Sequence, residues 1–464
     1  MKKKKLITFL NLVFVVIQIS NTNAQTWNIG YPDRTSVTAT FSNKLLVIKG
    51  KGDMKNYPIY ETWKNKEIEN VQIENGVTNI GHHAFYDCNK LKSISIPEGV
   101  TSIGESAFKN CENLENLIIP NSTVEIKENA FESCKSLKSI IIPNNILQIN
   151  EYAFYECFNL INIQLGSGLN KIGSCAFRAC HNLASITIPK NTIDIGIIAF
   201  RECYNMENIE VEKGNTKFNS INGVLFNKKK DTLLAYPNGK KGKYIIPKST
   251  LVIGNSAFAS SKINSVNIPK TVKIIKGDAF RYCNNLKNIK IPNSVNEIGN
   301  LTFANCDSLE RIKLGSSITE LNMYILSQNE NLLKIKISRK NLKFKSKRGI
   351  LYNKSSDTLV MYPRGKKGDF IIPENVICIK KGAFEGCEGL TKIVIPKSLK
   401  TIEDLAFQYC SNLIEVTNKS NIPQIISNQV FSEKKLLLVP EKDIQLYKNA
   451  KEWQDFLRIQ KINL

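Results

Sequence analysis

The chain has 464 residues, 42% of them hydrophobic, which is ample for a large core. Ordinary Gly and Pro contents exclude a collagen-like or low-complexity chain, and three His leave little room for imidazole catalysis or His-rich metal sites. The 64 Lys and Arg against 41 Asp and Glu give a net charge of +23, which favours anionic partners without specifying a fold.

Residues 1–24 have the pattern of a bacterial secretory signal. Lysines at positions 2–5 precede an apolar stretch from Leu6 to Ile19, and the segment ends at the small residue Ala24. An uncleaved membrane anchor is the alternative, but about 20 apolar residues are needed to span a bilayer. Because no later run is long enough either, we expect an exported protein without a transmembrane anchor after cleavage.

A 23-residue repeat dominates the rest of the sequence. The dipeptide Ala-Phe recurs at this spacing, and the series resumes after two interruptions. The repeat positions are Phe85, Phe108, Phe131, Phe154, Phe177, Phe200, Phe258, Phe280, Phe303, Leu326, Phe384 and Phe407, with Phe431 as a degenerate last member. One unit cannot bury its apolar side alone, so twelve clear units predict a stacked solenoid.

The apolar spacing within one unit predicts the path of a coil. Ile94 and Ile96 alternate with polar neighbours, as in a strand with one buried face, and Pro97 ends that strand. Gly104 suits a position with positive φ, and Phe108 is expected to fill the coil interior. We expect the Ile-x-Ile segments of all units to pair in one parallel sheet with strands ~4.8 Å apart.

Two inserts interrupt the array, at about 212–243 and 338–369. They match each other at an offset of 126 residues, so that Gly223–Asn227 corresponds to Gly349–Asn353. Each is expected to form two short strands around a polar turn, a β-hairpin. The array therefore contains a larger internal duplication.

The chain end is expected to form a cap. Leu446, Tyr447, Ala450, Trp453 and Leu457 recur at helical spacing and should cover the last coil. An open coil end would expose both apolar core and strand edges.

The unit pattern C-x-x-L-x-x-I-x-I-P-x-x-V-x-x-I-G-x-x-A-F resembles the BspA-like, Treponema-type leucine-rich repeat. The inserts, the segment Leu45–Met54 and the tail Leu438–Phe456 are also similar to that family. The resemblance implies a leucine-rich-repeat solenoid, mainly β with a parallel sheet, at 65–431, between small caps at 25–64 and 432–464. It further implies a secreted or surface protein of host-associated microbes, with adhesion to matrix proteins credited to studied members. No catalytic residue comes with the family.

Ten of the twelve Cys follow a repeat position by three residues, so stacking should place them in one inward column. A free Cys there behaves as a small buried hydrophobe, and side chains in register do not easily adopt a disulfide's ~90° dihedral. We therefore expect free thiols. Metal binding is disfavoured because no C-x-x-C pair occurs and His82, His83 and His181 do not complete a site.

No sequence motif points to catalysis. G-x-S-x-G, P-loop, G-x-G-x-x-G and H-E-x-x-H strings do not occur, and His82-His83 is expected to be an exposed pair. We expect neither enzymatic activity nor a cofactor, although an inward-facing cluster of polar side chains in a pocket would argue for an enzyme. Export disfavours nucleic acid as a partner.

The outward strand positions change from neutral to basic along the array. Early coils display groups such as Ser93 and Asn116, with Ile118 and Ile141 as a second, protein-binding patch. From Leu286 to Arg348 there are 12 Lys and Arg against 5 Asp and Glu. The candidate ligand-binding residues are Lys290, Arg311, Lys313, Lys334 and Lys336, which would bind an anionic glycan or protein. General surface charge is the other interpretation.

The sequence thus predicts an exported, non-enzymatic protein that binds host or extracellular macromolecules through its repeat surface. A periplasmic or envelope scaffold of the same cell is the alternative.

Overall fold

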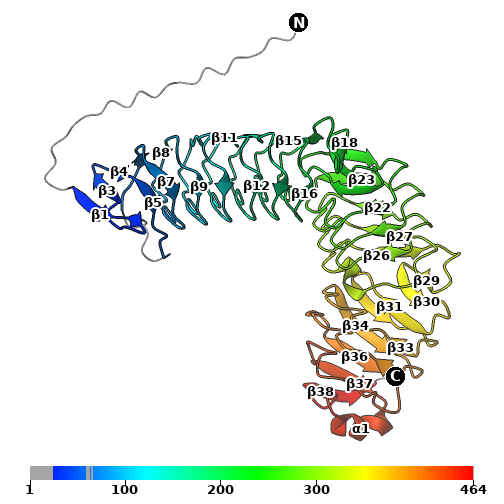
Figure 1. The fold of residues 1–464 in the computed structure, drawn as a ribbon. Coiled ribbons are helices and arrows are strands. Elements are labelled where there is room, and N and C mark those ends of the chain that lie inside the picture. The colour runs from blue at the N-terminus through cyan, green and yellow to red at the C-terminus, as the bar shows by residue number, and fades with distance from the viewer. Residues whose placement is uncertain (1–23, 59–62, 64–65, 463–464) are drawn as a thin grey trace.

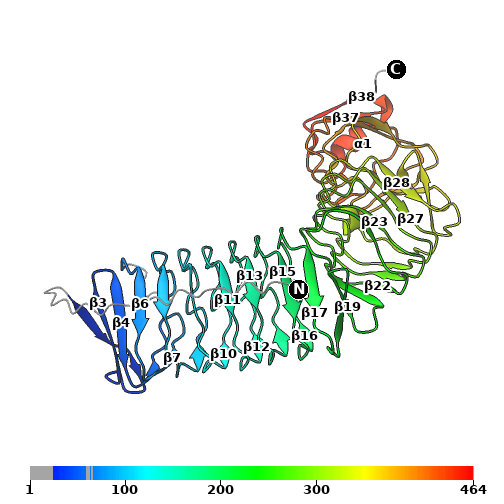
Figure 2. The same cartoon turned by 90° about the horizontal axis from the view of Figure 1, so that it is seen from above.

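The computed structural model describes residues 24–58, 63 and 66–462, so the predicted signal lies outside the described residues except for Ala24. The chain winds into a β-solenoid bent like an L, with the early coils in one arm and the later coils in the other (Figure 1). Figure 2 shows the coils of the first arm stacked side by side along its length. The predicted solenoid of 23-residue repeats is confirmed.

The Ile-x-Ile segments form the strands of a first face. Ile94 and Ile140 point inward while the residues on either side of them are more exposed, and Ser139 pairs in parallel with Asn162 one coil later. The strands are β4 (Leu45–Gly50), β6 (Asn70–Ile73), β8 (Ser93–Ser95), β11 (Ser139–Ile141), β13 (Asn162–Gln164), β15 (Ser185–Ile188), β17 (Asn208–Val211), β21 (Gly242–Ile245), β23 (Ile263–Asn267), β25 (Asn288–Lys290), β27 (Arg311–Leu314), β28 (Lys334–Ile337), β32 (Gly368–Ile371), β34 (Leu390–Ile395), β36 (Glu415–Asn418) and β37 (Leu436–Val439).

The expectation of one continuous sheet is wrong. The first face is divided into several sheets. The inserts separate β17 from β21 and β28 from β32, and β13 and β15, like β23 and β25, are adjacent in the array without being paired in one sheet. Coil 111–120 has no strand on this face. Its residue Asn116 forms isolated parallel β-bridges with Ser93 in the preceding coil and with Ser139 in the next coil.

A second face of short parallel strands was not predicted. These strands lie on the return path of the coils, where Ile103, for example, pairs with Ile126 of the next coil. The strands are too short for a two-residue periodicity to appear in the sequence. The strands are β5 (Gly52–Met54), β7 (Val77–Ile80), β9 (Ser102–Ile103), β10 (Glu125–Ile126), β12 (Gln148–Ile149), β14 (Lys171–Ile172), β16 (Asp194–Ile195), β20 (Thr232–Ala235), β22 (Val252–Ile253), β24 (Ile274–Ile275), β26 (Glu297–Ile298), β31 (Thr358–Met361), β33 (Cys378–Ile379) and β35 (Thr401–Ile402).

Stacked phenylalanines fill the coil interior. Phe108 and Phe131 are fully buried with parallel rings 5.3 Å apart, and the same stacking recurs along the array. Beside this stack, the Cys134 thiol donates a hydrogen bond to the carbonyl oxygen of Phe108 at 3.2 Å, a pattern that most repeat cysteines share. All twelve cysteines are free thiols, and all but the half-buried Cys378 are buried.

The repeat glycine is required for close packing rather than for a left-handed backbone. Gly104 does not have positive φ, so that expectation is wrong. A Cβ at Gly104 would lie 2.6 Å from the backbone nitrogen of His82 in the preceding coil. The left-handed positions are instead the residues two before and two after the repeat phenylalanine, such as Ser106 and Asn110.

The inserts separate three hydrophobic cores. The predicted hairpins are present as β19 (Val224–Asn227) with β20 and β30 (Ile350–Asn353) with β31, each preceded by an unpredicted strand, β18 (Phe218–Ile221) or β29 (Phe344–Lys347). Leu225 belongs to the first core, whereas Val224 and Phe226 belong to the second. Strand β30 divides the second core from the third in the same way.

Small elements close both ends. β1 (Gln25–Asn28), β2 (Gly30–Tyr31) and β3 (Val37–Ser42) precede the first coil. At the other end lie η4 (Glu441–Asp443), α1 (Ile444–Asn449) and β38 (Arg458–Lys461). The predicted helical cap is only partly correct: α1 ends at Asn449, Leu446 and Leu457 are exposed, and β38 adds a strand beside β37.

Candidate ligand-binding face

The five predicted cations lie together on three adjacent strands. Alternation in β25, β27 and β28 buries Ile289, Ile312 and Ile335 and leaves the residues between them exposed. The parallel register pairs Lys290 with Lys313 and Lys313 with Lys336, and pairs Arg311 with Lys334. We call Lys290, Arg311, Lys313, Lys334 and Lys336 the basic face.

The basic face has no carboxylate partners. Within the described part of the chain, none of its five cations takes part in an ion pair. Neutralisation between coils is common elsewhere on the solenoid. Lys44 and Lys92 donate to Glu69 from either side at 2.6 and 2.7 Å, and these hydrogen bonds lower the Glu69 pKa to about 2. The positive potential of the basic face is therefore not cancelled locally.

The second insert extends this surface. Strand β29 lies beside β28, where the Ile337 backbone N–H donates to Ser346 Oγ at 3.3 Å. Exposed Lys347 and Arg348 of this insert were not singled out from the sequence. Comparison at the 126-residue offset could have found them, because the first insert has Ile221 and Asn222 there.

The duplicated block supplies a counterpart of the basic face that lacks two of its lysines. At the offset of 126 residues, Lys334 and Lys336 correspond to Asn208 and Glu210 on β17. Glu210 accepts a hydrogen bond from Ser220 Oγ at 3.0 Å. The same backbone framework therefore displays opposite charge in its two copies.

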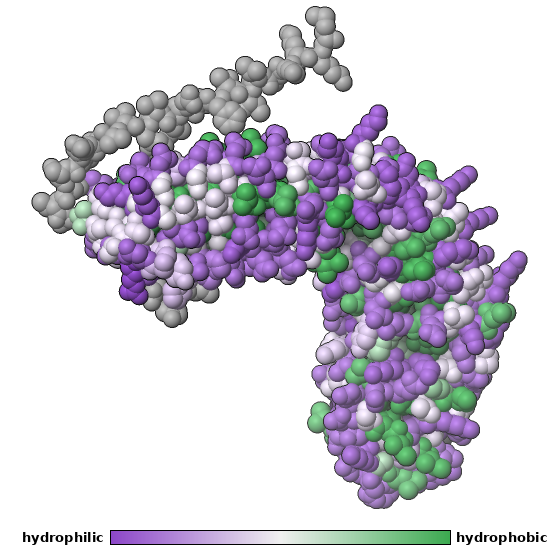
Figure 3. Space-filling view, in the orientation of Figure 1, coloured by the Kyte–Doolittle hydropathy of each residue, from purple (hydrophilic) through white to green (hydrophobic). Residues whose placement is uncertain are grey.

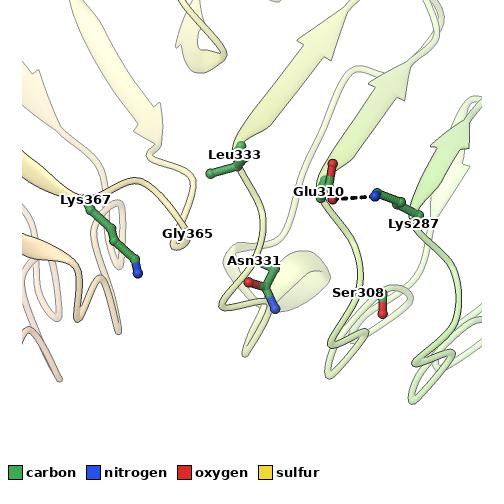
Figure 4. A pocket seen from close by; sticks show the side chains of 7 residues that line it. All are labelled: Lys287, Ser308, Glu310, Asn331, Leu333, Gly365 and Lys367. Atoms are coloured by element: carbon green, nitrogen blue, oxygen red, sulfur yellow. Dashed lines mark ion pairs between the residues drawn. The ribbon is translucent and has the colours of Figure 1, made fainter.

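An open hollow adjoins the starts of the basic strands. It measures about 540 Å³ and lies where Leu333, immediately before β28, faces the turn at Gly365. Figure 4 shows Lys287 paired with Glu310 on one side, at 3.0 Å, and Lys367 on the other. Lys367 brings a further ammonium group to the edge of this hollow.

The repeat cysteines and the pair His82 and His83 are partly or fully enclosed by the fold. Burial raises the pKa of the Cys203 and Cys283 thiols to about 12, so they are protonated at neutral pH. His82 and His83 are half-buried rather than exposed, and His83 Nδ1 lies 3.0 Å from the Tyr57 carbonyl oxygen. Among the described residues, no three His, Cys, Asp or Glu side chains are grouped to hold a metal ion.

Comparison with known proteins identifies the repeat. A family model described as "BspA type Leucine rich repeat region (6 copies)" matches residues 60–167, 147–234, 251–358 and 366–454, well over half of the chain. The chain belongs to the BspA-type leucine-rich-repeat family. No curated protein gives a significant match.

Solved leucine-rich-repeat structures share the fold. A leucine-rich repeat protein from Eubacterium ventriosum is 22% identical, with a TM-score of 0.52 over 84% of this chain and 90% of that one. A leucine rich cell surface protein from Faecalibacterium prausnitzii is 25% identical, with a TM-score of 0.50 over 84% of this chain and 94% of that one. Over the described residues of this BspA-type protein, no helix combines the length and apolar character needed to cross a membrane.

Proposed function

We propose that this BspA-type protein is an exported, non-enzymatic binding protein whose basic face holds an extended anionic partner, a sulfated glycan or an acidic protein segment. The observation that carries the proposal is the register of the five exposed cations on β25, β27 and β28, which have no carboxylate partner among residues 24–58, 63 and 66–462. Side chains on neighbouring strands are ~5 Å apart, and like charges that close repel by about 1 kcal/mol or more. A polyanion that spans the strands relieves this repulsion.

Adhesion to host or extracellular macromolecules is the role we propose for this face. Family membership, the cell-surface description of the Faecalibacterium relative and the N-terminal signal pattern support it. The alternative role is an envelope scaffold of the same cell. Antibody or protease access to the chain on intact cells distinguishes the two, because only the adhesin must be reachable from outside.

The basic face is tested with Lys290→Glu, Lys313→Glu and Lys336→Glu combined. Heparin and polyglutamate serve as probes, and their binding affinity is measured by calorimetry over a range of salt concentrations. We expect wild-type binding to weaken steeply as salt rises, because exposed charges are screened over ~8 Å at physiological ionic strength. The triple variant should lose binding and keep its fold, since all three side chains are exposed.

The matched control changes three exposed lysines on other coils, Lys190, Lys397 and Lys400, to Glu. It has the same net charge as the test variant and should bind nearly like wild type. Equal losses in both variants would mean that net charge alone attracts the probe, and the basic face would be rejected as a site.

A further inference from the structure

A cavity lies at the corner of the L, where the first core ends and the second begins. It measures about 350 Å³, and its walls come from β16 and the turn after it, from β18 and β20, and from the turn after β22. Apolar residues such as Ile197 and Leu234 and polar residues such as Asn238 and Arg201 line it together. Figure 1 places these elements at the bend, and we call this cavity the elbow cleft.

At the elbow cleft, two backbone N–H groups have no partner among the described residues, although the equivalent N–H groups are hydrogen-bonded in every earlier regular coil. In coil 175–179, the N–H groups of Cys175, Phe177 and Ala179 donate to carbonyl oxygens of the next coil at 3.2, 2.9 and 2.8 Å. The four preceding coils repeat this pattern. In the following coil, the equivalent N–H groups of Ile198 and Phe200 have no acceptor among the described residues, and both residues line the elbow cleft.

A buried side-chain acceptor on the opposite wall also lacks a partner. Asn238 is 3% exposed, and its Nδ2 donates to the Ala259 carbonyl oxygen at 2.7 Å. Its Oδ1 has no hydrogen-bond partner in the part of the chain that the structure describes. A buried acceptor without a donor costs about 1–3 kcal/mol, so the site favours a ligand that supplies an N–H or O–H group.

Two isoleucines at the cleft depart from the repeat pattern. Ile197 is 69% exposed at a position where Glu105, Glu128 and Glu151 stand in other coils. Ile198 has φ of 51° and is the one β-branched residue with positive φ in the described chain. A β-branched side chain is strained in this conformation, and such strain concentrates at binding sites.

The second insert closes its own junction with side chains. Arg364 replaces Asn238 at the 126-residue offset, and its Nε donates to the Glu385 carbonyl oxygen at 2.8 Å. Met323 replaces Ile197, and its Cε fills the space that a Cβ on Gly382 would need. The Tyr324 N–H, equivalent to that of Ile198, is capped by Asn322 Oδ1 at 2.8 Å.

We infer that the elbow cleft binds a short extended peptide segment of a partner protein. Peptide backbone is the occupant because the same N–H groups bind backbone carbonyls in every earlier regular coil. The peptide's carbonyl oxygens would accept from Ile198 and Phe200, one of its N–H groups would donate to Asn238 Oδ1, and an apolar side chain would contact Ile197. This site is separate from the basic face.

The test is a selection of random peptides displayed on phage against the purified chain, followed by measured dissociation constants. Ile197→Arg should weaken the selected peptides at least about tenfold, the order expected for losing one buried contact or hydrogen bond. Ile371→Arg is the matched control, because Ile371 is an isoleucine of similar exposure, at 66%, on another coil. The double variant Ile197→Met, Asn238→Arg copies the closed second junction and should abolish binding while keeping the fold.

Hydrogen exchange supplies an independent readout. The amides of Ile198 and Phe200 should exchange much faster than those of Cys175 and Phe177 in the free protein and become protected when peptide binds. The inference is overturned if no peptide is selected, if Ile197→Arg and Ile371→Arg have equal effects, or if the Ile198 and Phe200 amides are already protected in the free chain. Protection that appears only at high protein concentration would also overturn it, because the occupant would then be a second copy.

Discussion

At the residue scale, hydrogen bonding as much as side-chain volume determines which residue type stands three residues after the repeat phenylalanine. Most cysteines there donate to the carbonyl oxygen of the repeat phenylalanine in the preceding coil, as Cys306 does to Phe280 at 3.1 Å. Asn329 occupies the same position after Leu326 and meets the same need, with Nδ2 donating to the Phe303 carbonyl oxygen at 2.7 Å. The cysteine spacing predicted the buried column, but only the structure shows why a donor is needed there.

Thiol reactivity follows from this burial. In native protein at neutral pH, we expect an alkylating reagent to modify Cys378 alone among the cysteines, and slowly, because partial burial and Glu403 raise the pKa of its thiol. Raising the pH toward that pKa should accelerate the reaction, since the thiolate is the nucleophile. Timed alkylation with peptide mass spectrometry measures this.

In denaturant without reductant, all twelve cysteines should react. Modification of several repeat cysteines in the native protein, or disulfides in the denatured one, would contradict the buried-thiol column.

At the element scale, the sequence predicts those elements whose side chains alternate over several residues. The Ile-x-Ile strands meet this condition, whereas Ser102–Ile103 and its counterparts are paired through backbone register over two residues. The C-terminal cap differs from its predicted helix because packing overrides local spacing. Trp453 is fully buried, and its ring centroid lies 5.7 Å from that of Phe431. This contact forms although α1 ends at Asn449.

The cap is expected to be essential for solubility. Deleting residues 440–464 removes the Trp453 Nε1 hydrogen bond to the Gln424 carbonyl oxygen, 2.7 Å, and uncovers Phe431 and the edge of β37. An uncovered edge beside apolar core pairs with other chains, so the truncated protein should aggregate. Size-exclusion chromatography with light scattering measures the outcome.

The control for the truncation is Leu457→Lys, which changes an 81% exposed cap residue and should remain monodisperse. A soluble truncated chain that unfolds cooperatively would show that the last coil needs no cover.

At the scale of the whole molecule, the bend could not be predicted from the repeat. Twelve equal units indicate a straight stack, and the inserts by themselves indicate only additional hairpins. The bend coincides with the first insert, where β19 lies between two cores and a new aromatic column begins with Tyr236 stacked on Phe258. The alternation of the strands indicates the candidate cations, whereas the elbow cleft depends on this junction, and its signal in the sequence is limited to a departure from the repeat such as Ile197.

Small-angle scattering tests the shape. A compact globular chain of 464 residues has a radius of gyration of roughly 23 Å. The two-armed solenoid should give a clearly larger value and a distance distribution with an extended tail. A value near the globular one would contradict the L-shaped molecule.

Strand β19 and its counterpart β30 have a consequence for how such a chain can diversify. Because each strand completes one core on one side and begins another on its opposite side, a whole block of 126 residues can be copied into the chain without leaving an apolar surface open. Outward residues of the copy are then free to change, as the pair Glu210 and Lys336 illustrates. Copying of a block thus allows one copy of a surface to stay unchanged while the other copy, in the same chain, acquires a different binding specificity.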